Sequence, residues 1–301
     1  MKGKDHTIGW YLSNMLWIII QRVFPSKLYL SIRYRLIFGR WIDWDNPRYF
    51  TEKLQWLKLY YYGEKEAHLV DKVKSKDYVS QCVGEQYVLP LIGAWESAKD
   101  IPFDTLPKEY VLKCNHDCGS VFFCKEEQPI DEKIVRKDVS RRLRKNYYWS
   151  ARETPYKYVK PLVFAEPLMK SAVDKEIYDY KFFCFDGEPK LFKIDFNRFV
   201  EFHSNYYDMD GHILPFGVLP TVPVYSKSLP IPKNLSEMID IARKLSQGLP
   251  FARVDLYNPD GTIIVGEITL FPTAGFKRFT DDEWDLRIGS MLNLPKKAKG
   301  I

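Results

Sequence analysis

Polar and apolar residues alternate most regularly near the C-terminal end of the chain, in residues 251–269. Two alternating runs, 251–257 and 263–269, are separated by a segment that begins Asn-Pro-Asp-Gly. Alternation with a period of two predicts β-strands, and an interruption that contains proline and glycine predicts the turn between them. We therefore expect an antiparallel β-hairpin in this part of the chain.

The two strands of this hairpin carry the acidic residues Asp255 and Glu267, and the length of the turn decides how they are placed. A three-residue loop at 259–261 would put Asp255 opposite Val265. It would also put Arg253 opposite Glu267, so that both acids share one face as diagonal neighbours about 7 Å apart. Carboxylates at that separation can hold one or two Mg²⁺ ions.

Two alternatives stay open for the same hairpin. A two- or four-residue loop would turn the acids to opposite faces, and an exposed hairpin with its charges in water is the simplest reading. Val265 falls on the acid-bearing face in the three-residue arrangement, which indicates that this face is covered. Buried acids need partners.

Apolar residues recur at helical spacing in four further segments, roughly 51–61, 66–79, 131–146 and 234–247. In the last of these, Asn234 is the expected N-cap, Glu237 completes a capping box, and Gly248 ends the helix. Asp71 and Lys72, within the second segment, are expected either as a surface pair or as part of a site.

A lysine at the end of a predicted strand is the first candidate for binding chemistry. Lys113 closes an apolar run, a polar loop follows at 115–120, and a second strand returns at 121–124. A lysine in this position can neutralise a phosphate group, while the loop amides around Gly119 and Ser120 cradle its oxygens. The segment is not a P-loop, because the lysine precedes the loop.

Two metal-binding alternatives rest on short motifs. Four residues in and beside this loop suggest zinc, but their spacing matches none of the usual ligand pairs; they are Cys114, His116, Cys118 and Cys124. The sequence 208–211, Asp-Met-Asp-Gly, is similar to the DxD element that holds a metal in many nucleotide-sugar transferases. A turn is the more typical structure for it, since Asp-Gly is a common turn dipeptide.

Two more strands carry charges in apolar surroundings. Glu166 interrupts the apolar run 161–169, and a charge in such a run must be paired or face a ligand. Asp179 and Lys181 open a further strand that ends at the Asp186-Gly187 turn.

Composition narrows the class of protein. With 301 residues and 46% hydrophobic content, the chain can bury a large core, as one domain or as two to three interlocked ones. A formal net charge of +6 favours acidic partners such as nucleotides, uronic polymers or an anionic membrane surface. We do not expect nucleic acid as a partner, and nothing indicates an oligomeric state. Five cysteines, an odd number, without a recognisable secretory signal predict a reduced, cytoplasmic location.

The N-terminal segment 10–24 is apolar, but it is too short and too polar to span a bilayer. Basic residues follow it among tyrosines and leucines; they are Lys27, Arg33, Arg35 and Arg40. This pattern is typical of peripheral binding to anionic lipid, and equally of a packed pair of helices.

Taken in order, the parts are a strand with a lysine and a loop, an apolar strand with one glutamate, and a hairpin with two carboxylates. This order resembles the ATP-grasp superfamily. Five stretches more narrowly resemble the TupA-like ATP-grasp proteins of polysaccharide and teichuronopeptide biosynthesis, from about residue 46 to near the C-terminal end; they are FTEKLQWLKLYY, VLKCNHDCGSV, DYKFFCFDGEP, FARVDLY and GEITLFPTAGF.

The resemblance implies an α+β ATP-grasp fold in which two lobes grip ATP. The ATP-grasp domain would cover about 106–295, with a lysine and loop lobe at about 106–165 and a metal-binding lobe at about 166–295. A helical and α/β region at 46–105 and a helical extension at 1–45 would precede it.

For the nucleotide, the resemblance implies Lys113 as the phosphate-binding lysine, together with the loop residues Asn115, His116, Gly119 and Ser120. Glu166 would open an interlobe hinge whose backbone meets adenine, through the Pro167 carbonyl and the Met169 amide. Asp179 would contact the ribose or the hinge, and Lys181 would be a second phosphate contact.

For the metal, the resemblance implies Asp255 and Glu267 as Mg²⁺ ligands, with Arg253 pairing or steering the reacting phosphoryl group. Many ATP-grasp enzymes have asparagine two residues after the metal glutamate, where this chain has Thr269, whose hydroxyl can still ligate.

The implied reaction is the activation of a carboxylate by ATP to an acyl phosphate, which an amine captures as an amide. The expected substrates are a glycan-linked carboxylate and a small-molecule amine such as an amino acid. A metal-dependent glycosyltransferase built around Asp208 and Asp210 and a nucleotide-binding module without turnover remain the alternatives.

Overall fold

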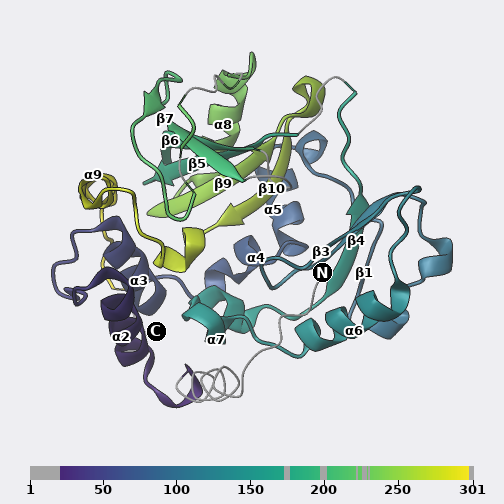
Figure 1. Cartoon of the computed structure of the whole chain (residues 1–301), viewed down its shortest axis with the longest axis horizontal. Helices are drawn as coiled ribbons and strands as arrows, with labels where there is room; N and C mark the ends of the chain where they lie inside the picture. The colour runs from purple at the N-terminus through teal and green to yellow at the C-terminus, as the bar shows by residue number, and fades with distance from the viewer. Residues whose placement is uncertain are drawn as a thin grey trace.

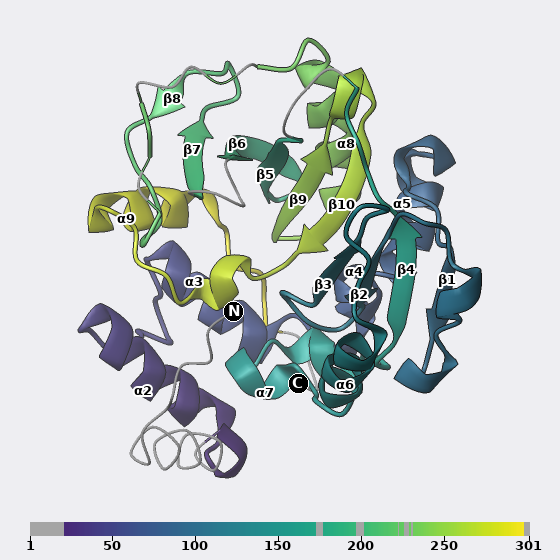
Figure 2. The ribbon, with the colours of Figure 1, turned by 45° about the vertical axis from the view of Figure 1, so that its right-hand side comes forward.

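The computed structural model describes residues 21–172, 177–196, 202–221, 223–225, 229 and 231–297. Two antiparallel sheets lie side by side, with α4 (Ala67–Val70) and α5 (Lys74–Val83) between them (Figures 1 and 2). None of the helices in the described part of the chain is long and apolar enough to cross a membrane.

The small sheet has the strand order β1-β4-β2-β3. Its strands are β1 (Gly93–Trp95), β2 (Tyr110–Cys114), β3 (Val121–Cys124) and β4 (Val163–Pro167). Helix α6 (Glu132–Leu143) covers one face, where its Val135 and Val139 join a core with Leu112 and Ala165. Because side chains alternate along a strand, the neighbouring Lys113 and Glu166 belong to the opposite face. A short helix, α7 (Tyr148–Ala151), follows α6.

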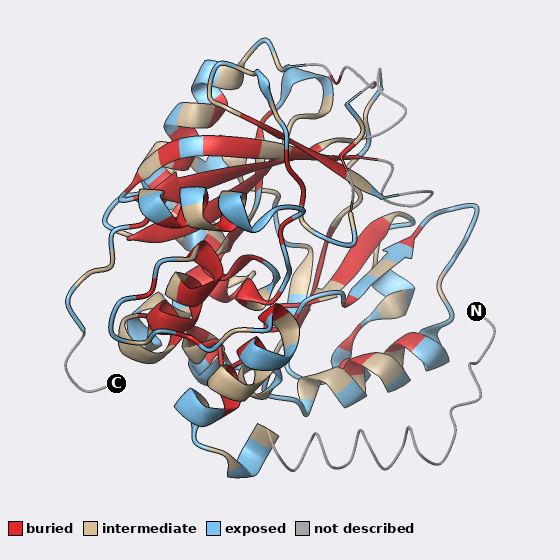
Figure 3. Ribbon diagram, turned by 60° about the vertical axis from the view of Figure 1, so that its left-hand side comes forward, coloured by how far each residue is buried: buried red, intermediate tan, exposed pale blue. Residues whose placement is uncertain are grey.

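The large sheet has the order β10-β9-β5-β6-β7-β8. Its strands are β5 (Asp179–Phe185), β6 (Glu188–Phe196), β7 (His203–Tyr207), β8 (Ile213–Leu214), β9 (Phe251–Tyr257) and β10 (Ile264–Thr269). Helix α8 (Leu235–Ser246) packs its buried stripe, including Ile241 and Leu245, against this sheet. Buried residues run along its strands (Figure 3).

The passage between the two sheets lies after Pro167, because β4 belongs to the small sheet and β5 to the large one. Strand β1, from the predicted region 46–105, also pairs within the small sheet. The lobe boundary near residue 165 remains a prediction. The connection is tied to the hairpin turn, since the Ser171 hydroxyl and the Ala172 amide donate to Asp260 at 2.6 and 2.8 Å.

The predicted hairpin is present as β9 and β10, but its predicted register is wrong. Glu267 lies directly opposite Asp255, and Val265 lies opposite Leu256. The connection is longer than three residues, and a β-bulge at Gly266 inserts one residue between these pairs. A Cβ at Gly266 would lie 2.7 Å from the Tyr257 ring, so only glycine fits there.

The bulge determines the faces of the hairpin. In a regular strand, residues 265 and 267 point the same way; here they point to opposite faces. Val265 therefore does not cover the acid-bearing face, contrary to expectation. The two acids still share a face, as direct neighbours rather than diagonal ones.

The predicted helix 234–247 is confirmed as α8, but its capping box is wrong, because Asn234 makes no side-chain cap. The Asn234 side chain instead donates to Gly261 O at 3.0 Å and accepts from the Asn258 side chain at 2.8 Å. Glu237 accepts from the Tyr87 hydroxyl at 2.6 Å. Asn234 therefore joins the helix to the hairpin turn.

The remaining helices form a layer beside the large sheet. They are α2 (Ser26–Phe38), α3 (Phe50–Tyr60) and α9 (Asp282–Met291). Tyr34 of α2 shares a hydrogen bond of 2.9 Å with Thr51 of α3, and Thr51 donates to the buried Asp285 of α9 at 2.6 Å. Most of the predicted apolar segment 10–24 lies outside the described residues.

Candidate active site

One face of the large sheet carries a row of side chains that are directly opposite one another across five strands. From β10 to β7 the row reads Glu267, Asp255, Lys181, Lys193 and Tyr206. Residues paired in register project from the same face of a sheet. The predicted site residues Asp255, Glu267 and Lys181 are therefore brought together, and we call this set the charged row.

Asp255 lies at the centre of the ion pairs and is buried. Arg253 binds both of its oxygens, from Nε and Nη2, each at 2.7 Å. Lys181 donates to Asp255 at 2.5 Å and to Asp179 at 2.6 Å. Burial would lower the pKa of Lys181, but Asp179 and Asp255 together raise it above its ordinary value.

This arrangement corrects one step of the sequence argument. Two close carboxylates cannot both stay charged without a cation, which would favour a metal ion between Asp255 and Glu267. The chain supplies those cations itself, because Arg253 contacts Asp255 and lies 3.4 Å from Glu267. The proximity of the two acids is thus no evidence for a metal on its own.

Glu267 is the open end of the charged row, with 37% of its side chain exposed. Its Oε1 accepts from the Thr269 hydroxyl at 3.2 Å, and its Oε2 lies 3.9 Å from Lys72 Nζ. Burial would raise the pKa of Glu267, but Lys72, Lys181 and Arg253 bring it down to about 2. An ionised and accessible carboxylate beside a hydroxyl is a donor set that suits Mg²⁺.

Across from the charged row, the small sheet contributes an ion pair between Lys113 and Glu166. The lysine that was predicted to neutralise a phosphate group is thus paired with a carboxylate in this structure. Lys76 of α5 also binds Glu166, at 3.2 Å, and donates to Leu89 O at 2.6 Å. Burial would raise the pKa of Glu166, but the two lysines lower it below its ordinary value.

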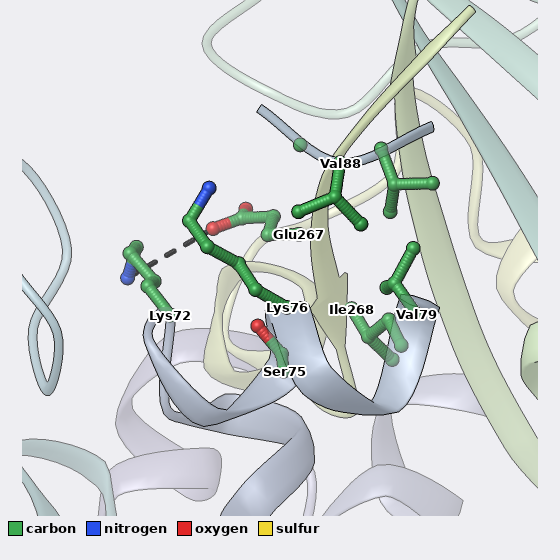
Figure 4. Close-up of a pocket in the computed structure, with 9 residues that line it drawn as sticks. Lys72, Ser75, Lys76, Val79, Val88, Glu267 and Ile268 are labelled. Atoms are coloured by element: carbon green, nitrogen blue, oxygen red, sulfur yellow. Dashed lines mark ion pairs between the residues drawn. The ribbon is translucent and has the colours of Figure 1, made fainter. Parts of the chain in front are cut away.

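Lys72 connects the small sheet to the charged row. Its Nζ donates to Asp117 O in the loop of the small sheet at 2.6 Å and forms the ion pair with Glu267 of β10. Figure 4 shows the Glu267 carboxylate turned toward Lys72 and Lys76 in a pocket between α5 and β10. Val79 and Ile268 form part of its apolar lining. We call this the lysine pocket.

The predicted helix 66–79 is broken at Asp71, and this break places Lys72. The buried Asp71 carboxylate accepts from the Val73 amide and from the Asn115 side chain, both at 2.9 Å. Asp71 is therefore not part of a surface pair.

Sequence reasoning missed Lys76 and Lys193 altogether, because a basic residue on a helix or strand of ordinary pattern carries no signal of what it faces.

Most side chains of the loop 115–120 are bonded within the small-sheet part of the molecule. Asn115 donates to Lys160 O at 3.0 Å, and the Nε2 of His116 lies 3.1 Å from Arg142 O. Ser120 accepts from the Cys114 amide at 2.9 Å. Gly119, with φ of 84°, has open space where a Cβ would stand. These side chains shape the loop, so their predicted contact with the nucleotide remains a prediction.

The hinge residues occupy the expected region, and their nucleotide contacts also remain predictions. Pro167 ends β4 opposite Tyr110, Met169 follows it half-buried, and Asp179 begins β5. Among the residues that the structure describes, one set places three candidate metal-ligand atoms close together: Asp208, Asp210 and His212. Asp208 there accepts from the amides of Asp210 and His212, as in the expected turn.

Comparison with known proteins places this chain in a family. The family model described as TupA-like ATPgrasp matches residues 52–293. No curated protein matches the chain in sequence. Similar solved structures include the ATP-grasp ligase PsnB with its minimal precursor, at 9% identity and a TM-score of 0.37, covering 68% of this chain and 54% of that one.

Two further structures match in the same way. The D-alanine–D-alanine ligase of Bacillus anthracis shows 17% identity and a TM-score of 0.37, with 67% of this chain and 57% of that one covered. The D-cycloserine synthetase DcsG shows 15% identity and a TM-score of 0.40, with 74% and 69% covered. The chain thus spans little more than half the length of the first two. With the family model matched over most of its length, the chain belongs to the TupA-like ATP-grasp family and has the α+β ATP-grasp fold.

Proposed function

We propose that the protein is an ATP- and Mg²⁺-dependent carboxylate-amine ligase that acts through an acyl phosphate in the biosynthesis of a surface polysaccharide. One observation carries the proposal: Lys72 forms an ion pair with the ionised carboxylate of Glu267, and Lys76, which lines the same pocket, shares the Glu166 carboxylate with Lys113. A polyphosphate needs several cations, and a magnesium ion needs a hard oxygen ligand beside them.

Some of these residues could bind Mg²⁺ or ATP as they stand, and others are already bonded within the chain. Glu267 and Thr269 offer accessible oxygens for Mg²⁺. Asp255 fits less directly, since it is already bonded by Arg253 and Lys181 and would share an oxygen with them. Lys113 and Lys76 both bind the Glu166 carboxylate in this structure. Each would have to move from Glu166 to reach a phosphate group.

When bound, ATP supplies the phosphoryl group and Mg²⁺ offsets its charge. The residues of the chain would position the reacting groups and stabilise the charge that develops on them. Asp255 fixes the guanidinium of Arg253 beside Glu267, so this cation faces the place where negative charge develops during phosphoryl transfer. The substrate carboxylate would form a bond to the γ-phosphorus while the bond to ADP breaks. The amine would then displace phosphate from the acyl phosphate and release a proton from its nitrogen as the amide forms.

The glycosyltransferase alternative is less well placed. Asp208 and Asp210 lie on the turn between β7 and β8, at the opposite edge of the large sheet from β10. Asp208 is bonded to backbone amides of its own turn. A module that binds nucleotide without turnover would keep the lysine pocket and show no acyl transfer.

A thermal-shift comparison, followed by hydroxylamine trapping, tests the proposal. ATP with Mg²⁺ should stabilise the fold by about 2.7 kcal/mol at 100 times its Kd, and UDP-sugars should not. A correct carboxylate substrate should then yield a hydroxamate together with ADP. Stabilisation by UDP-sugars alone would favour the transferase, and ATP binding without hydroxamate for any uronic acid would favour the binding module.

We also propose that this reaction takes place in the cytoplasm, at the inner face of the membrane. All five cysteines are free thiols. Helix α2 presents an outward stripe in which Leu36 is 71% and Leu28 is 47% exposed, flanked by the exposed Lys27 and Arg35. Apolar side chains framed by cations suit an anionic lipid surface. Leu36→Glu should weaken sedimentation with phosphatidylglycerol vesicles, and unchanged sedimentation would remove α2 from membrane contact.

A further inference from the structure

One glutamate outside the charged row and the lysine pocket is buried without a partner in the described part of the chain. Glu153 lies between α7 and the short helix η5 (Thr154–Tyr158), with 6% of its surface exposed. Among the described residues, none forms a hydrogen bond or an ion pair with its carboxyl group. Buried carboxyl groups normally have such partners, because burial without them costs free energy. A carboxyl group that lacks them is a candidate for binding a ligand.

The backbone is fixed on both sides of Glu153. Arg152, before it, has a φ of 57° in the left-handed region, and its amide donates to Tyr148 O at 2.7 Å. Positive φ costs free energy for a non-glycine residue and persists only where the surroundings enforce it. After Glu153, the Thr154 hydroxyl donates to Lys58 O of α3 at 2.5 Å. Helices α7 and α3 therefore determine where Glu153 stands.

Lys58 compensates the charge of Glu153 without occupying its oxygens. Burial raises the pKa of Glu153 above its ordinary value, and among the charges that oppose this, Lys58 acts most strongly. The Lys58 Nζ nevertheless donates to three other oxygens: Gln55 Oε1 at 2.9 Å, Ala151 O at 3.0 Å and Ala274 O at 2.7 Å. An ammonium group has only three hydrogens. Lys58 therefore has no donor left for Glu153, whose carboxyl group stays open to a ligand.

Glu153 lies near the Glu267 end of the charged row. Helix η5 packs against α4, the helix that directly precedes Asp71 and Lys72. The positive charge of Lys72, which pairs with Glu267, also opposes the rise in the pKa of Glu153. Burial raises the pKa of Tyr156 on η5, and the charges of Glu153 and Glu267 raise it further. Tyr156 is thus within electrostatic reach of both acids, which places Glu153 beside the proposed reaction centre.

The charge of this carboxyl group selects one of the reactants. An ionised carboxylate repels the phosphates of a nucleotide and a second carboxylate. An ammonium group offers both the positive charge and the N–H donors that Glu153 lacks, and such charge-assisted hydrogen bonds are the strong ones. The amine is the one reactant of the proposed ligation that arrives as a cation, and it must lose a proton before its nitrogen can attack.

We propose that Glu153 is the catalytic base of the second half-reaction, which binds the ammonium group of the amine substrate and accepts its proton. The neutral nitrogen then forms a bond to the acyl carbon, and the bond from this carbon to the phosphate oxygen breaks. Phosphate leaves with the electron pair and takes the second proton of the nitrogen. This assignment rests on the proposed ligase function, because it takes an amine as the second substrate.

Two nucleophiles separate the step that needs a base from the step that does not. Hydroxylamine is neutral near pH 7, whereas an equimolar mixture of the common amino acids carries ammonium groups. With the carboxylate that the hydroxylamine trap identifies, Glu153→Gln should keep hydroxamate formation within about twofold of wild type. The same variant should reduce the ADP release that depends on the amino acids by at least about 100-fold, the lower range of general base catalysis.

Two further variants exclude a merely structural effect. Glu64→Gln, at an exposed glutamate on the neighbouring helix η1 (Glu64–Glu66), is the matched control and should change neither reaction. Glu153→Asp keeps the negative charge near Lys58, and so protects the fold, but withdraws the carboxylate by one methylene. It should show the same selective loss to a smaller extent.

The pH profile adds a readout that packing alone would not change. The charged and titratable groups around Glu153 are Lys58, Arg33, Lys72, Tyr147 and Tyr156. In wild type, the rate with amino acids should level off once the pH exceeds the raised pKa of Glu153. In Glu153→Gln, this rate should continue to rise toward the pKa of the amine itself, because only the neutral amine can react.

The outcomes keep the two proposals apart. If wild type forms hydroxamate, the ligase proposal stands whatever Glu153→Gln does. An equal loss of both reactions in Glu153→Gln, or a loss of neither, would then overturn only the assignment of Glu153. Wild type that binds ATP and forms no hydroxamate would overturn the ligase proposal, and the base with it.

Discussion

Lys181 and Lys193 lie directly opposite each other on β5 and β6, so two lysines are neighbours on one buried face. Burial would lower both pKa values, but Asp179 and Asp255 raise that of Lys181, whereas that of Lys193 stays below its ordinary value. Like charges in this position are destabilising unless carboxylates compensate them. The charged row is therefore one network, in which the loss of one member leaves other buried charges without a partner.

Removing the charge of Glu267 should slow turnover strongly in a chain that still folds. We expect Glu267→Gln to reduce hydroxamate formation on the order of 100-fold, because the residue proposed to hold the Mg²⁺ that offsets the developing charge is lost as an anionic ligand. The exposed Glu127→Gln is the control. Turnover that persists in Glu267→Gln, with an unchanged Mg²⁺ requirement, would exclude Glu267 as a ligand.

The ion pair of Lys113 predicts a cost in stability as well as in activity. Lys113→Met should lower the free energy of unfolding by about 1–3 kcal/mol, because the buried Glu166 keeps only Lys76 as its charged partner. A double-mutant cycle with Glu166→Gln in urea measures the coupling. Additive effects of the two substitutions would show that the pair contributes nothing to folding.

Lys72 should contribute to nucleotide binding, although it lies in no recognised motif. We expect Lys72→Ala to weaken ATP binding about tenfold, the equivalent of roughly 1.4 kcal/mol, through the loss of one charge-assisted hydrogen bond. Lys74→Ala is the matched control, because Lys74 is exposed two residues further on. Similar affinities in the two variants would exclude Lys72 from the nucleotide site.

The pKa of Glu267 predicts a defined pH dependence of stability. Its value of about 2 lies below the ordinary 4.5. A carboxyl group with a lowered pKa in the folded state contributes stability above its unfolded pKa, and the contribution is lost as the pH falls from about 4.5 to about 2. The stability difference between wild type and Glu267→Gln should therefore shrink in this window. Urea unfolding between about pH 3 and pH 6 measures it, and a constant difference would contradict the lowered pKa.

The sequence predicted the parts of the site that follow from local patterning. Alternation predicted the hairpin of Asp255 and Glu267, and the strand end predicted Lys113. Strand alternation cannot predict an inserted residue, so the register predicted for the two strands around Gly266 was wrong. Lys72 depends on a helix break that Asp71 makes with Asn115, from a distant part of the chain. Contacts between residues so far apart in the sequence depend on tertiary packing, and no local sequence pattern predicts them.

Because of the bulge at Gly266, a larger side chain at this position should disturb the pairing of β10 more than deletion of the residue would. Deleting Gly266 would leave Val265 opposite Leu256 and Glu267 opposite Asp255, as in a regular strand, so both side chains would keep their faces. A substitution that forced the same six-residue strand to pair regularly would instead turn Glu267 into the apolar layer beneath α8. A shortened hairpin is thus expected to retain the charged row that a full-length Gly266→Val chain loses.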